Sequence, residues 1–532
     1  MSSLSRASAT VAAGTLVSRI TGLLRNIVLA AALGTIGTRA ADSFAIANQL
    51  PNNIYAIISS GLLAGVIVPQ IVKAAAHRDG GSAFVSKLLT LGVVALAATT
   101  VVAVIAAPLL VQLYGSQLSP ESAALTLAFA YWCLPQLLFY GLYALLGEIL
   151  NARRVFGPFA WSPIINNVVS IAGFAAFIWL FGLHRDATGW TPEMVAVMGG
   201  TATLGIVAQA LVLLLFWRRA GLHVRPDFAW RGIGLRHIAR LAGWTFLMVV
   251  VGQLAGLVQT NLVGRASGEG ASVAALQYAW LVFMLPFSVI VLSIGTPYFT
   301  RLSEHVAAGR HDEVRTDLDA SIRIIGVFMV GALAAIVAAI VPVSRIFTDG
   351  PSGAVQFALV LGGYLIALLP LSMQFGIQRT FYAHHDTRTP FVFTAVQAVL
   401  VIVTAIAAFV LLPLPLLGFG IALGQSIANI VQLCLAVWLL RRKIGPLGLR
   451  PAALSYLRFL AAAVPAAAAG WLTFLLLGGV EGWAASDKGP AVLATLAIAA
   501  VALLVYLAVL GLLRAPELRT ALGAARRFLP RR

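Results

Sequence analysis

Two arginines lie inside an apolar stretch that is otherwise composed to cross a lipid bilayer. The stretch runs from Thr10 to Leu33, and Arg19 and Arg25 each lie three residues from its centre at Gly22. At ~1.5 Å of rise per residue, both arginines lie roughly 5 Å from the midplane, whereas the interface lies ~15 Å away. A charge at that depth costs ~2.5 kcal/mol or more, so it faces a cavity or a partner. Because guanidinium groups suit phosphate, we expect the pair to bind an anionic ligand.

The spacing of the two arginines leaves a second interpretation open. Residues six apart are separated by about 240° on an ideal helix, so one straight helix does not present both on one face. Gly22 between them allows either a kink or a close approach of another helix. In the alternative interpretation, each arginine pairs with a carbonyl or an acid and only holds helices together.

The next apolar segment begins with an unusually polar sequence, ADSFAIANQLPNN, which contains Asp42 and Asn52. So polar a helix needs a face that is wet or lined by protein, and we therefore count Asn52 among the candidate binding residues. Asp42 is predicted either to pair with an arginine and gate the outer side, or to cap the helix at the interface. Glu148, further along the chain, is predicted to pair with Arg153 or Arg154 rather than to carry protons.

The composition is that of a membrane protein. The 532 residues are 60% hydrophobic and only 10% charged, and the mean hydropathy is +0.94. The net charge of +18 would suit nucleic acid, but the basic residues lie at the ends of apolar segments, which excludes that partner. Cys133 and Cys434 fall inside apolar segments and are expected to be buried hydrophobic residues rather than a disulfide.

Apolar runs long enough to cross a bilayer recur from end to end. The sequence therefore predicts an all-α polytopic membrane protein with fourteen transmembrane helices, and no soluble domain. The expected spans are 10–33, 43–72, 86–114, 122–150, 158–182, 194–217, 238–264, 272–300, 322–347, 354–382, 389–412, 416–440, 455–477 and 489–513.

The basic residues between the spans predict the topology. If the N-terminus is cytoplasmic, 29 of the basic residues fall on the cytoplasmic side and five on the opposite side. Such a bias supports an even number of spans with both termini in the cytoplasm.

A weak internal repeat predicts two similar halves. Leu-Pro precedes a glycine by about ten residues both in QLPNNIYAIISSG (49–61) and in MLPFSVIVLSIG (284–295), six spans later. Transporters are often built from such repeats, with the substrate between them. We expect an N-terminal lobe of helices 1–6 (1–220), a C-terminal lobe of helices 7–12 (221–445), and two additional helices with a basic cytoplasmic tail (446–532).

Enzyme signatures are absent from the sequence. No HExxH metal pair, glycine-rich phosphate loop or nucleophile elbow occurs. We therefore expect a transporter with no catalytic residues, no metal site and no cofactor. A membrane glycosyltransferase would usually carry acidic pairs in an outer loop, and here those loops are short and hold few acids.

Four segments resemble the MurJ (MviN) family of lipid II flippases, within the multidrug/oligosaccharidyl-lipid/polysaccharide exporter superfamily. They are SRITGLLRN (18–26), DSFAIANQLPN (42–52), GEILNARRVFGPFAWSPIINN (147–167) and FYAHHDTRTP (381–390). The resemblance implies fourteen helices, a solvated cationic cavity between two lobes, and a groove for the polyprenyl tail beside the last two helices. Lipid II, an undecaprenyl-pyrophosphate-linked disaccharide peptide, would bind in the cavity, and alternating access would carry its head group outward.

The resemblance also assigns individual residues. The family's two first-helix arginines fall on Arg19 and Arg25, and its second-helix aspartate falls on Asp42. An arginine that follows Leu-Pro-Asn in the family is Tyr55 here, and the arginine of the eighth span falls near Leu281. The chain is therefore identified as a divergent member, and its predicted substrate-binding residues are Arg19, Arg25, Asp42, Asn52 and Tyr55.

Some members of the family use carboxylates of the C-terminal lobe to bind sodium. None occurs here within 238–264, 389–412 or 416–440, so a sodium site is not expected.

We thus expect a lipid II flippase of the bacterial plasma membrane, acting in peptidoglycan biosynthesis, with membrane lipid and cell-wall synthesis proteins as further partners. Export of another polyprenyl-linked glycan or of drugs is an alternative, although a drug/cation antiporter would need intramembrane acids. A non-transporting membrane scaffold for cell-wall synthesis is the alternative of a different class.

Overall fold

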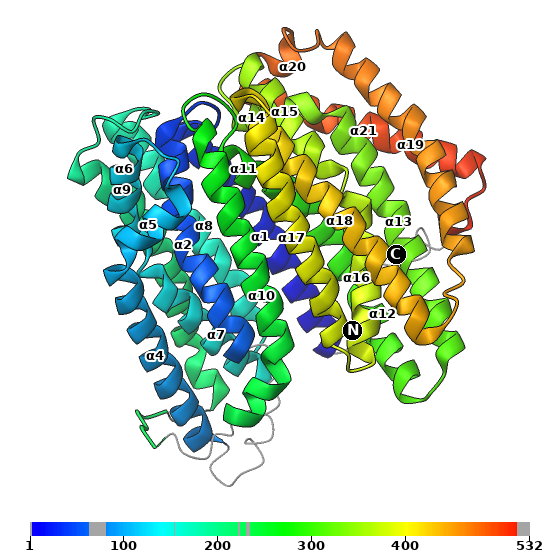
Figure 1. Cartoon of the computed structure of the whole chain (residues 1–532), viewed down its shortest axis with the longest axis horizontal. Coiled ribbons are helices and arrows are strands. Elements are labelled where there is room, and N and C mark those ends of the chain that lie inside the picture. The colour runs from blue at the N-terminus through cyan, green and yellow to red at the C-terminus, as the bar shows by residue number, and fades with distance from the viewer. Residues whose placement is uncertain (1–2, 63–80, 154, 222–223, 230–234, 519–532) are drawn as a thin grey trace. The chain divides into compact units, whose positions relative to one another are not determined.

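The computed structural model describes residues 3–62, 81–153, 155–221, 224–229 and 235–518 (Figure 1). The part of the second expected span after Leu62 and the expected basic tail beyond residue 518 lie outside these ranges. Helices dominate, and no β-strand occurs among the described residues. The chain divides into two compact units, Met1–Gly268 and Glu269–Arg532.

The first unit is a set of nine α-helices within the described residues. They are α1 (Ser3–Leu33), α2 (Arg39–Leu62), α4 (Ser82–Ile105), α5 (Ala107–Gly115), α6 (Pro120–Cys133), α7 (Gln136–Ala152), α8 (Gly157–Phe181), α9 (Pro192–Leu211) and α10 (Leu235–Val263). In this unit α8 packs between α1 and α9, while α2 packs against α6 and α10.

The second unit contains the remaining helices. They are α11 (Val273–Pro286), α12 (Leu292–Ala307), α13 (His311–Ala338), α14 (Ile340–Phe347), α15 (Pro351–Leu365), α16 (Leu368–Ala383), α17 (Arg388–Leu411), α18 (Leu414–Ile444), α19 (Arg450–Leu476), α20 (Trp483–Ser486) and α21 (Lys488–Leu512). A π-helical turn, Phe287–Val291, joins α11 to α12. α13 packs against α19, α16 and α12, and α17 packs along α18.

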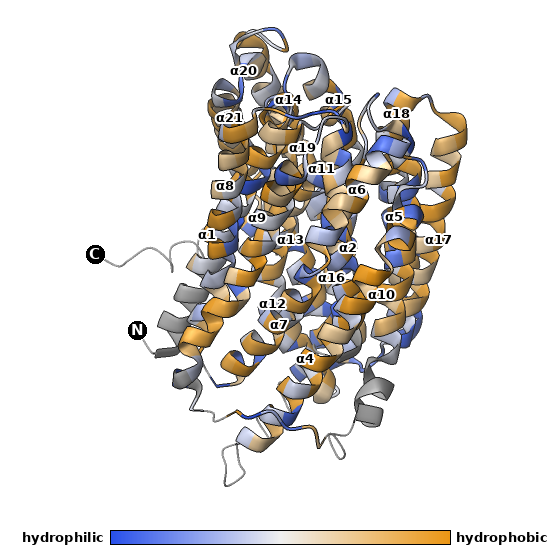
Figure 2. Ribbon diagram, turned by 90° about the vertical axis from the view of Figure 1, so that its left-hand side faces the viewer, coloured by the Kyte–Doolittle hydropathy of each residue, from blue (hydrophilic) through white to orange (hydrophobic). Residues whose placement is uncertain are grey.

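The polytopic fold predicted from hydropathy is confirmed. Among the described residues, thirteen helical segments are long and apolar enough to cross a membrane, and each matches one expected span. The remaining expected span corresponds to the polar helix α2. Figure 2 shows α10 and α17 hydrophobic along most of their length. Large apolar side chains such as Trp179 (83% exposed) and Val410 (72% exposed) lie on the surface, as contact with lipid requires.

Several expected spans that were continuous in the sequence pattern consist of two helices. The span predicted at 122–150 breaks between α6 and α7 at Pro135, which lacks the amide hydrogen that a continuous helix needs. Pro286 likewise precedes the π-helical turn between α11 and α12. Hydropathy measures only how apolar a stretch is, so it does not detect such breaks.

The division into units does not coincide with the expected lobe boundary at residue 220. The first unit extends to Gly268 and includes α10, the seventh expected span, because α10 packs against α2 and α5. The two six-helix lobes and the separate pair of C-terminal helices therefore stay a prediction.

In the second unit, a buried arginine joins α14 to the segment between α19 and α21. Arg345 is 5% exposed. Its Nε donates to the carbonyl of Ala485 (3.0 Å), and its Nη2 donates to the carbonyl of Ser486 (3.0 Å). The exposed carboxylate of Asp487 lies 3.7 Å away. Carbonyl oxygens thus satisfy most of this buried charge.

The opposite ends of α19 and α21 are joined to α13 by a buried ionic network. Asp319 accepts a hydrogen bond from the amide of Ala452 at the start of α19 (3.1 Å), and it pairs with Arg323 (2.8 Å). Arg323 also pairs with Glu517, which follows α21, at 3.3 Å. Glu517 accepts a hydrogen bond from Ser455 of α19 (2.7 Å). The start of α19 and the end of α21 are therefore tied to the same helix.

Candidate anion-binding site

The predicted binding residues lie on α1 and α2 of the first unit, in different surroundings. Arg19 is exposed and Arg25 is half-buried on α1. On α2, Asn52 is exposed, Tyr55 is half-buried, and Asp42 is almost completely buried at 1% exposure. The different burial of the two arginines agrees with their predicted separation of about 240° around the helix.

The polar face of α1 is fixed by α8. Asn167 Nδ2 donates to the carbonyl of Ser18 (3.1 Å) and to the hydroxyl of Thr21 (2.9 Å). A Cβ on Gly22 would lie 3.5 Å from the same amide nitrogen. Of the two roles left open for Gly22, a close approach of helices is the one found, since α1 continues as one helix through it.

Arg25 lies within electrostatic range of Tyr140 on α7, which leads to a set of neutral polar side chains. The Tyr140 hydroxyl donates to Gln136 Oε1 (3.3 Å). Gln136 Nε2 in turn donates to Asn48 Oδ1 (3.2 Å) and to the hydroxyl of Thr203 on α9 (3.0 Å). These residues, together with Tyr55, are called the Gln136 cluster below.

Tyr55 joins this cluster through its ring. Its ring stacks on that of Tyr140, with centroids 6.0 Å apart and planes inclined by 28°. Tyr140 therefore contacts Tyr55 directly and lies within electrostatic range of Arg25. A guanidinium within electrostatic range of a cluster of hydroxyl and amide groups is suited to bind an oxyanion and the neutral hydroxyls attached to it.

Asp42, another of the predicted residues, lies far from Tyr140. Asp42 lies in the first turn of α2, ~20 Å along the helix axis from Tyr55. There a carboxylate is favoured by the helix dipole. The capping role and the gating role of Asp42 both stay predictions. Asn53, which directly follows the exposed Asn52 on α2, is buried. It donates to the Tyr114 hydroxyl (3.2 Å) and so holds α2 to α5.

Sequence reasoning missed Gln136, Tyr140 and Thr203. Gln136 directly follows Leu-Pro in the middle of an apolar run, at the break between α6 and α7. A polar residue beside a helix break is the available signal, because broken helices inside a membrane usually line a site. The pairing of Glu148 with Arg153 or Arg154 stays a prediction, since residue 154 lies outside the described ranges.

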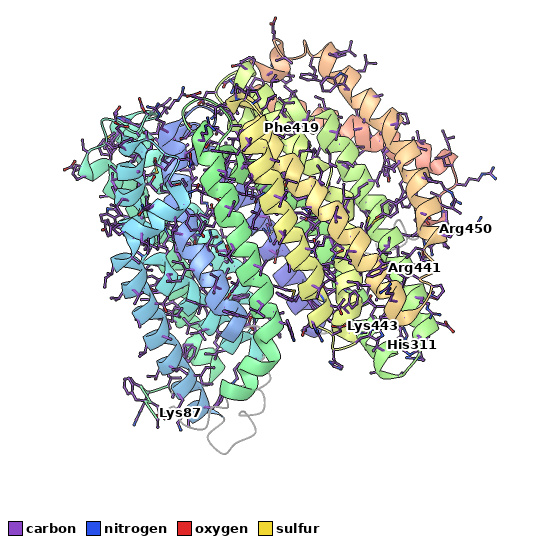
Figure 3. The ribbon with its side chains drawn as sticks, in the orientation of Figure 1. Lys87, His311, Phe419, Arg441, Lys443 and Arg450 are labelled. Carbon is purple, nitrogen blue, oxygen red and sulfur yellow. The ribbon has the colours of Figure 1, made fainter. Side chains whose placement is uncertain are left out.

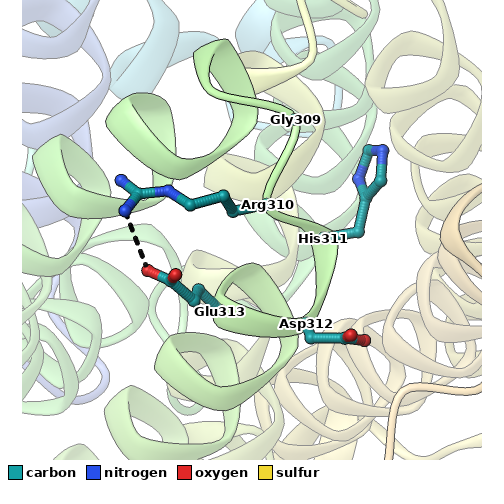
Figure 4. A pocket seen from close by; sticks show the side chains of 5 residues that line it. All are labelled: Gly309, Arg310, His311, Asp312 and Glu313. Atoms are coloured by element: carbon teal, nitrogen blue, oxygen red, sulfur yellow. Dashed lines mark ion pairs between the residues drawn. The ribbon is translucent and has the colours of Figure 1, made fainter.

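A pocket lies elsewhere, in the second unit. It measures about 350 Å³ and is lined by the consecutive residues Gly309 to Glu313 (Figure 4). Arg310 and Glu313 form an ion pair across it at 3.5 Å. Its positive charge is thus neutralised locally, and it is not a better anion site than Arg25. Among the described residues, no group of three or more His, Cys, Asp or Glu is placed to hold a metal ion.

The many helices that are long and apolar enough to cross a membrane define a polytopic helical membrane protein. Solved structures share its fold. An inward closed conformation of lipid II flippase MurJ matches with a TM-score of 0.71 and 18% identity, covering 93% of this chain and 97% of that one. An inward-facing MATE family multidrug transporter matches with a TM-score of 0.61 and 16% identity, covering 80% of this chain and 98% of that one.

The chain belongs to the MurJ family, because the family model described as lipid II flippase MurJ matches residues 29–487. The lipid II flippase MurJ of Burkholderia cenocepacia is 28% identical over 492 residues, covering 91% of this chain and 90% of the relative. A probable lipid II flippase MurJ of Rhizobium tropici is 28% identical over 446 residues, covering 81% of this chain and 80% of the relative. Arg19 and Arg25 precede the range matched by the family model, so their binding roles stay predictions.

Proposed function

We propose that this protein moves lipid II from the cytoplasmic to the outer face of the bacterial plasma membrane. One observation carries the proposal: the MurJ family model matches most of a chain that folds as a multi-pass helical membrane protein. The position of Arg25 supports the same substrate, because lipid II carries its charge on a pyrophosphate that a half-buried guanidinium can bind.

Each predicted residue has a role in this proposal. Arg25 binds the pyrophosphate next to the Gln136 cluster, and the exposed Arg19 makes the second contact as the head group enters. Tyr55 offers an aromatic face and a hydroxyl to the sugars where other family members carry arginine. Asn52, exposed one turn before Tyr55, bonds to sugar or peptide groups. Asp42 acts near the turn between α1 and α2, where it orients the two helices.

Transport requires that the site open to one face of the membrane and then to the other. We assign both termini to the cytoplasm, which places the turn between α1 and α2 at the outer face. The polyprenyl tail stays in the bilayer beside α19 and α21 while the head group crosses. Cell-wall synthesis proteins are proposed as partners that consume the exported precursor.

Depletion of the protein in its own host tests the function. Lipid II is expected to accumulate on the cytoplasmic side, and wild-type protein is expected to restore its export. Arg25→Ala should fail to restore export, whereas Arg219→Ala should succeed, because Arg219 is exposed and its described contact is with the ring of Phe216. Unchanged lipid II distribution after depletion, in cells without a second flippase, would reject the flippase function.

The residue roles are tested separately with purified protein. Loss of a charge-assisted contact worth ~1.5–3 kcal/mol should weaken lipid II binding about 10- to 100-fold in Arg25→Ala. Arg25→Lys keeps the charge but not the two-pronged contact and should lie in between. If Arg25→Ala and Arg19→Ala together bind and flip lipid II as the wild type does, the arginine site is wrong even where the family function stands.

A further inference from the structure

The ends of α18 and α19 that face the turn 445–449 carry an exposed basic surface for which the proposed flippase function gives no role. Four arginines on these ends are exposed: Arg441, Arg442, Arg450 and Arg458. None of the four forms an ion pair among the described residues. Lys443 between them is different, because it pairs with Asp386. Figure 3 labels Arg441, Lys443 and Arg450 at this end of the second unit.

The two arginines of α19 lie on a stripe that faces lipid. Leu454 (47% exposed) and Leu457 (64% exposed) follow Arg450 by four and seven residues, so they share its face of the helix. Arg458 lies eight residues from Arg450, which places the two arginines ~12 Å apart along the axis. Their guanidinium groups therefore bracket exposed leucines at one end of a helix that is long enough to span the bilayer.

α18 ends with the combination of side chains that suits a membrane interface. Trp438 is 46% exposed, and the guanidinium of Arg442 lies 3.7 Å from the centroid of its ring. Tryptophan is enriched at the level of lipid head groups, where its ring is half in hydrocarbon. A guanidinium stacked on that ring keeps its N–H edge available to a phosphate oxygen.

We propose that Trp438, Arg441, Arg442, Arg450, Leu457 and Arg458 form a binding surface for an anionic phospholipid of the cytoplasmic leaflet. The argument is charge complementarity: four uncompensated guanidinium groups and an interfacial tryptophan adjoin apolar side chains that must contact acyl chains. The surface binds the phosphate and the acyl chains together, so a soluble phosphate compound is not its ligand. It is independent of whether the transported substrate is lipid II.

The test uses the full chain in nanodiscs. Phosphatidylglycerol is titrated into phosphatidylcholine nanodiscs, and bound lipid is counted by native mass spectrometry after release. The pair Arg450→Gln and Arg458→Gln should weaken phosphatidylglycerol retention about fivefold for each arginine, since each basic residue near an anionic surface contributes ~1 kcal/mol. Arg450→Lys with Arg458→Lys should restore most of the retention, because the charge remains.

A charge-matched pair, Lys87→Gln with Arg310→Gln, is the control. Arg310 is ion-paired with Glu313, and Lys87 belongs to the other unit, so this pair should retain phosphatidylglycerol like the wild type. An equal loss in both pairs, or equal retention of phosphatidylcholine, would overturn the proposal by showing only a net-charge effect. Weaker lipid II binding by the α19 pair in pure phosphatidylcholine would assign the surface to the transported substrate instead, and would also overturn it.

Discussion

Gln136 uses both ends of its side-chain amide within one cluster. It accepts from Tyr140, and it donates to Asn48 and Thr203, while being only 1% exposed. Thr203 extends this hydrogen-bond network, because its hydroxyl donates to the carbonyl of Trp132 (2.7 Å), just before the break between α6 and α7. One amide thus connects α2, α7 and α9 and helps to position Tyr140, the tyrosine within electrostatic range of Arg25.

We expect Gln136→Leu to lower both stability and substrate binding. The change leaves the buried partners of the amide without hydrogen bonds, at ~1–3 kcal/mol, which a thermal unfolding curve in detergent will detect. Lipid II affinity should fall as well, measured at a temperature where the variant is fully folded.

Gln397→Leu is the matched control for this prediction. Gln397 lies in the second unit and makes one described bond, to Asn429 Oδ1 at 3.4 Å. It should lose a little stability without any change in lipid II affinity. Normal lipid II binding by Gln136→Leu would show that the cluster only holds helices together.

At the residue scale, the sequence predicted the charges but not their neighbours. Arg25 was identifiable because a charge inside an apolar helix is rare and expensive. Gln136 and Tyr140 are ordinary residues in membrane helices. Only the folded chain shows that Gln136 bonds both to Tyr140 and to Asn48, which lies 88 positions before it.

At the scale of elements, close packing of α8 and α9 depends on glycine. An added Cβ at Gly173 would lie 2.3 Å from the Cβ of Thr201 on α9. Gly205 of α9 is confined in the same way, since its Cβ would lie 2.9 Å from the carbonyl oxygen of Asn166. Small residues at such crossings let membrane helices approach closely.

Gly173→Ala should therefore destabilise the protein by ~1–3 kcal/mol through overpacking. Gly252→Ala on α10 is the matched change, because nothing lies within 4 Å of its added Cβ. That variant should be neutral, or up to ~1 kcal/mol more stable, as alanine favours helix. Thermal unfolding of both variants in detergent is the measurement. Equal midpoints would show that α8 and α9 move apart to accommodate the added methyl group without a loss of stability.

The turn between α16 and α17 contains the motif FYAHHDTRTP, and the structure gives it a local role. Asp386 accepts hydrogen bonds from the amide (2.9 Å) and the hydroxyl (2.8 Å) of Thr389 in the first turn of α17, and it pairs with Lys443 of α18. Burial raises the pKa of the Asp386 carboxyl, but the bonds from Lys443 and Thr389 together outweigh it, so the net pKa is below the ordinary 3.8.

Because the folded pKa is the lower one, Asp386 stabilises the protein above pH 3.8, and this contribution is lost as the pH falls through the folded pKa. Asp386→Ala should cost about 1 kcal/mol near pH 7, the usual value of a helix cap. The difference from wild type should shrink below pH 4 in unfolding curves recorded across pH. A difference independent of pH would contradict the ion pair.

At the scale of the whole molecule, the pattern of apolar segments predicted the class of protein and most of its spans. The physical reason is that a bilayer imposes length and apolarity on every crossing, whatever packs against it. The breaks inside spans depend on single prolines, and the place where α10 packs depends on its tertiary contacts with α2 and α5. Neither is encoded in mean hydropathy.

Topology is the prediction that belongs to this scale. In a Cys133→Ser, Cys434→Ser background, Ala308→Cys in the turn before α13 is assigned to the cytoplasm. Glu481→Cys in the turn after α19 is assigned to the outer face. Both positions are exposed. A membrane-impermeant maleimide should label Glu481→Cys in intact cells and Ala308→Cys only after permeabilisation, and the reverse pattern would invert the whole assignment.

The two sets of contacts around Arg345 and Arg323 have a mechanical consequence. Arg345 fastens the turn between α19 and α21 to α14, and Arg323 with Asp319 fastens the other ends of the same helices to α13. Two helices that are held at one end by α13 and at the other by α14, the helix that follows α13, have no hinge of their own. During a transport cycle, α19 and α21 should therefore move with α13 as one rigid body. A lipid tail that lies on them would then contact a surface of constant shape throughout the cycle.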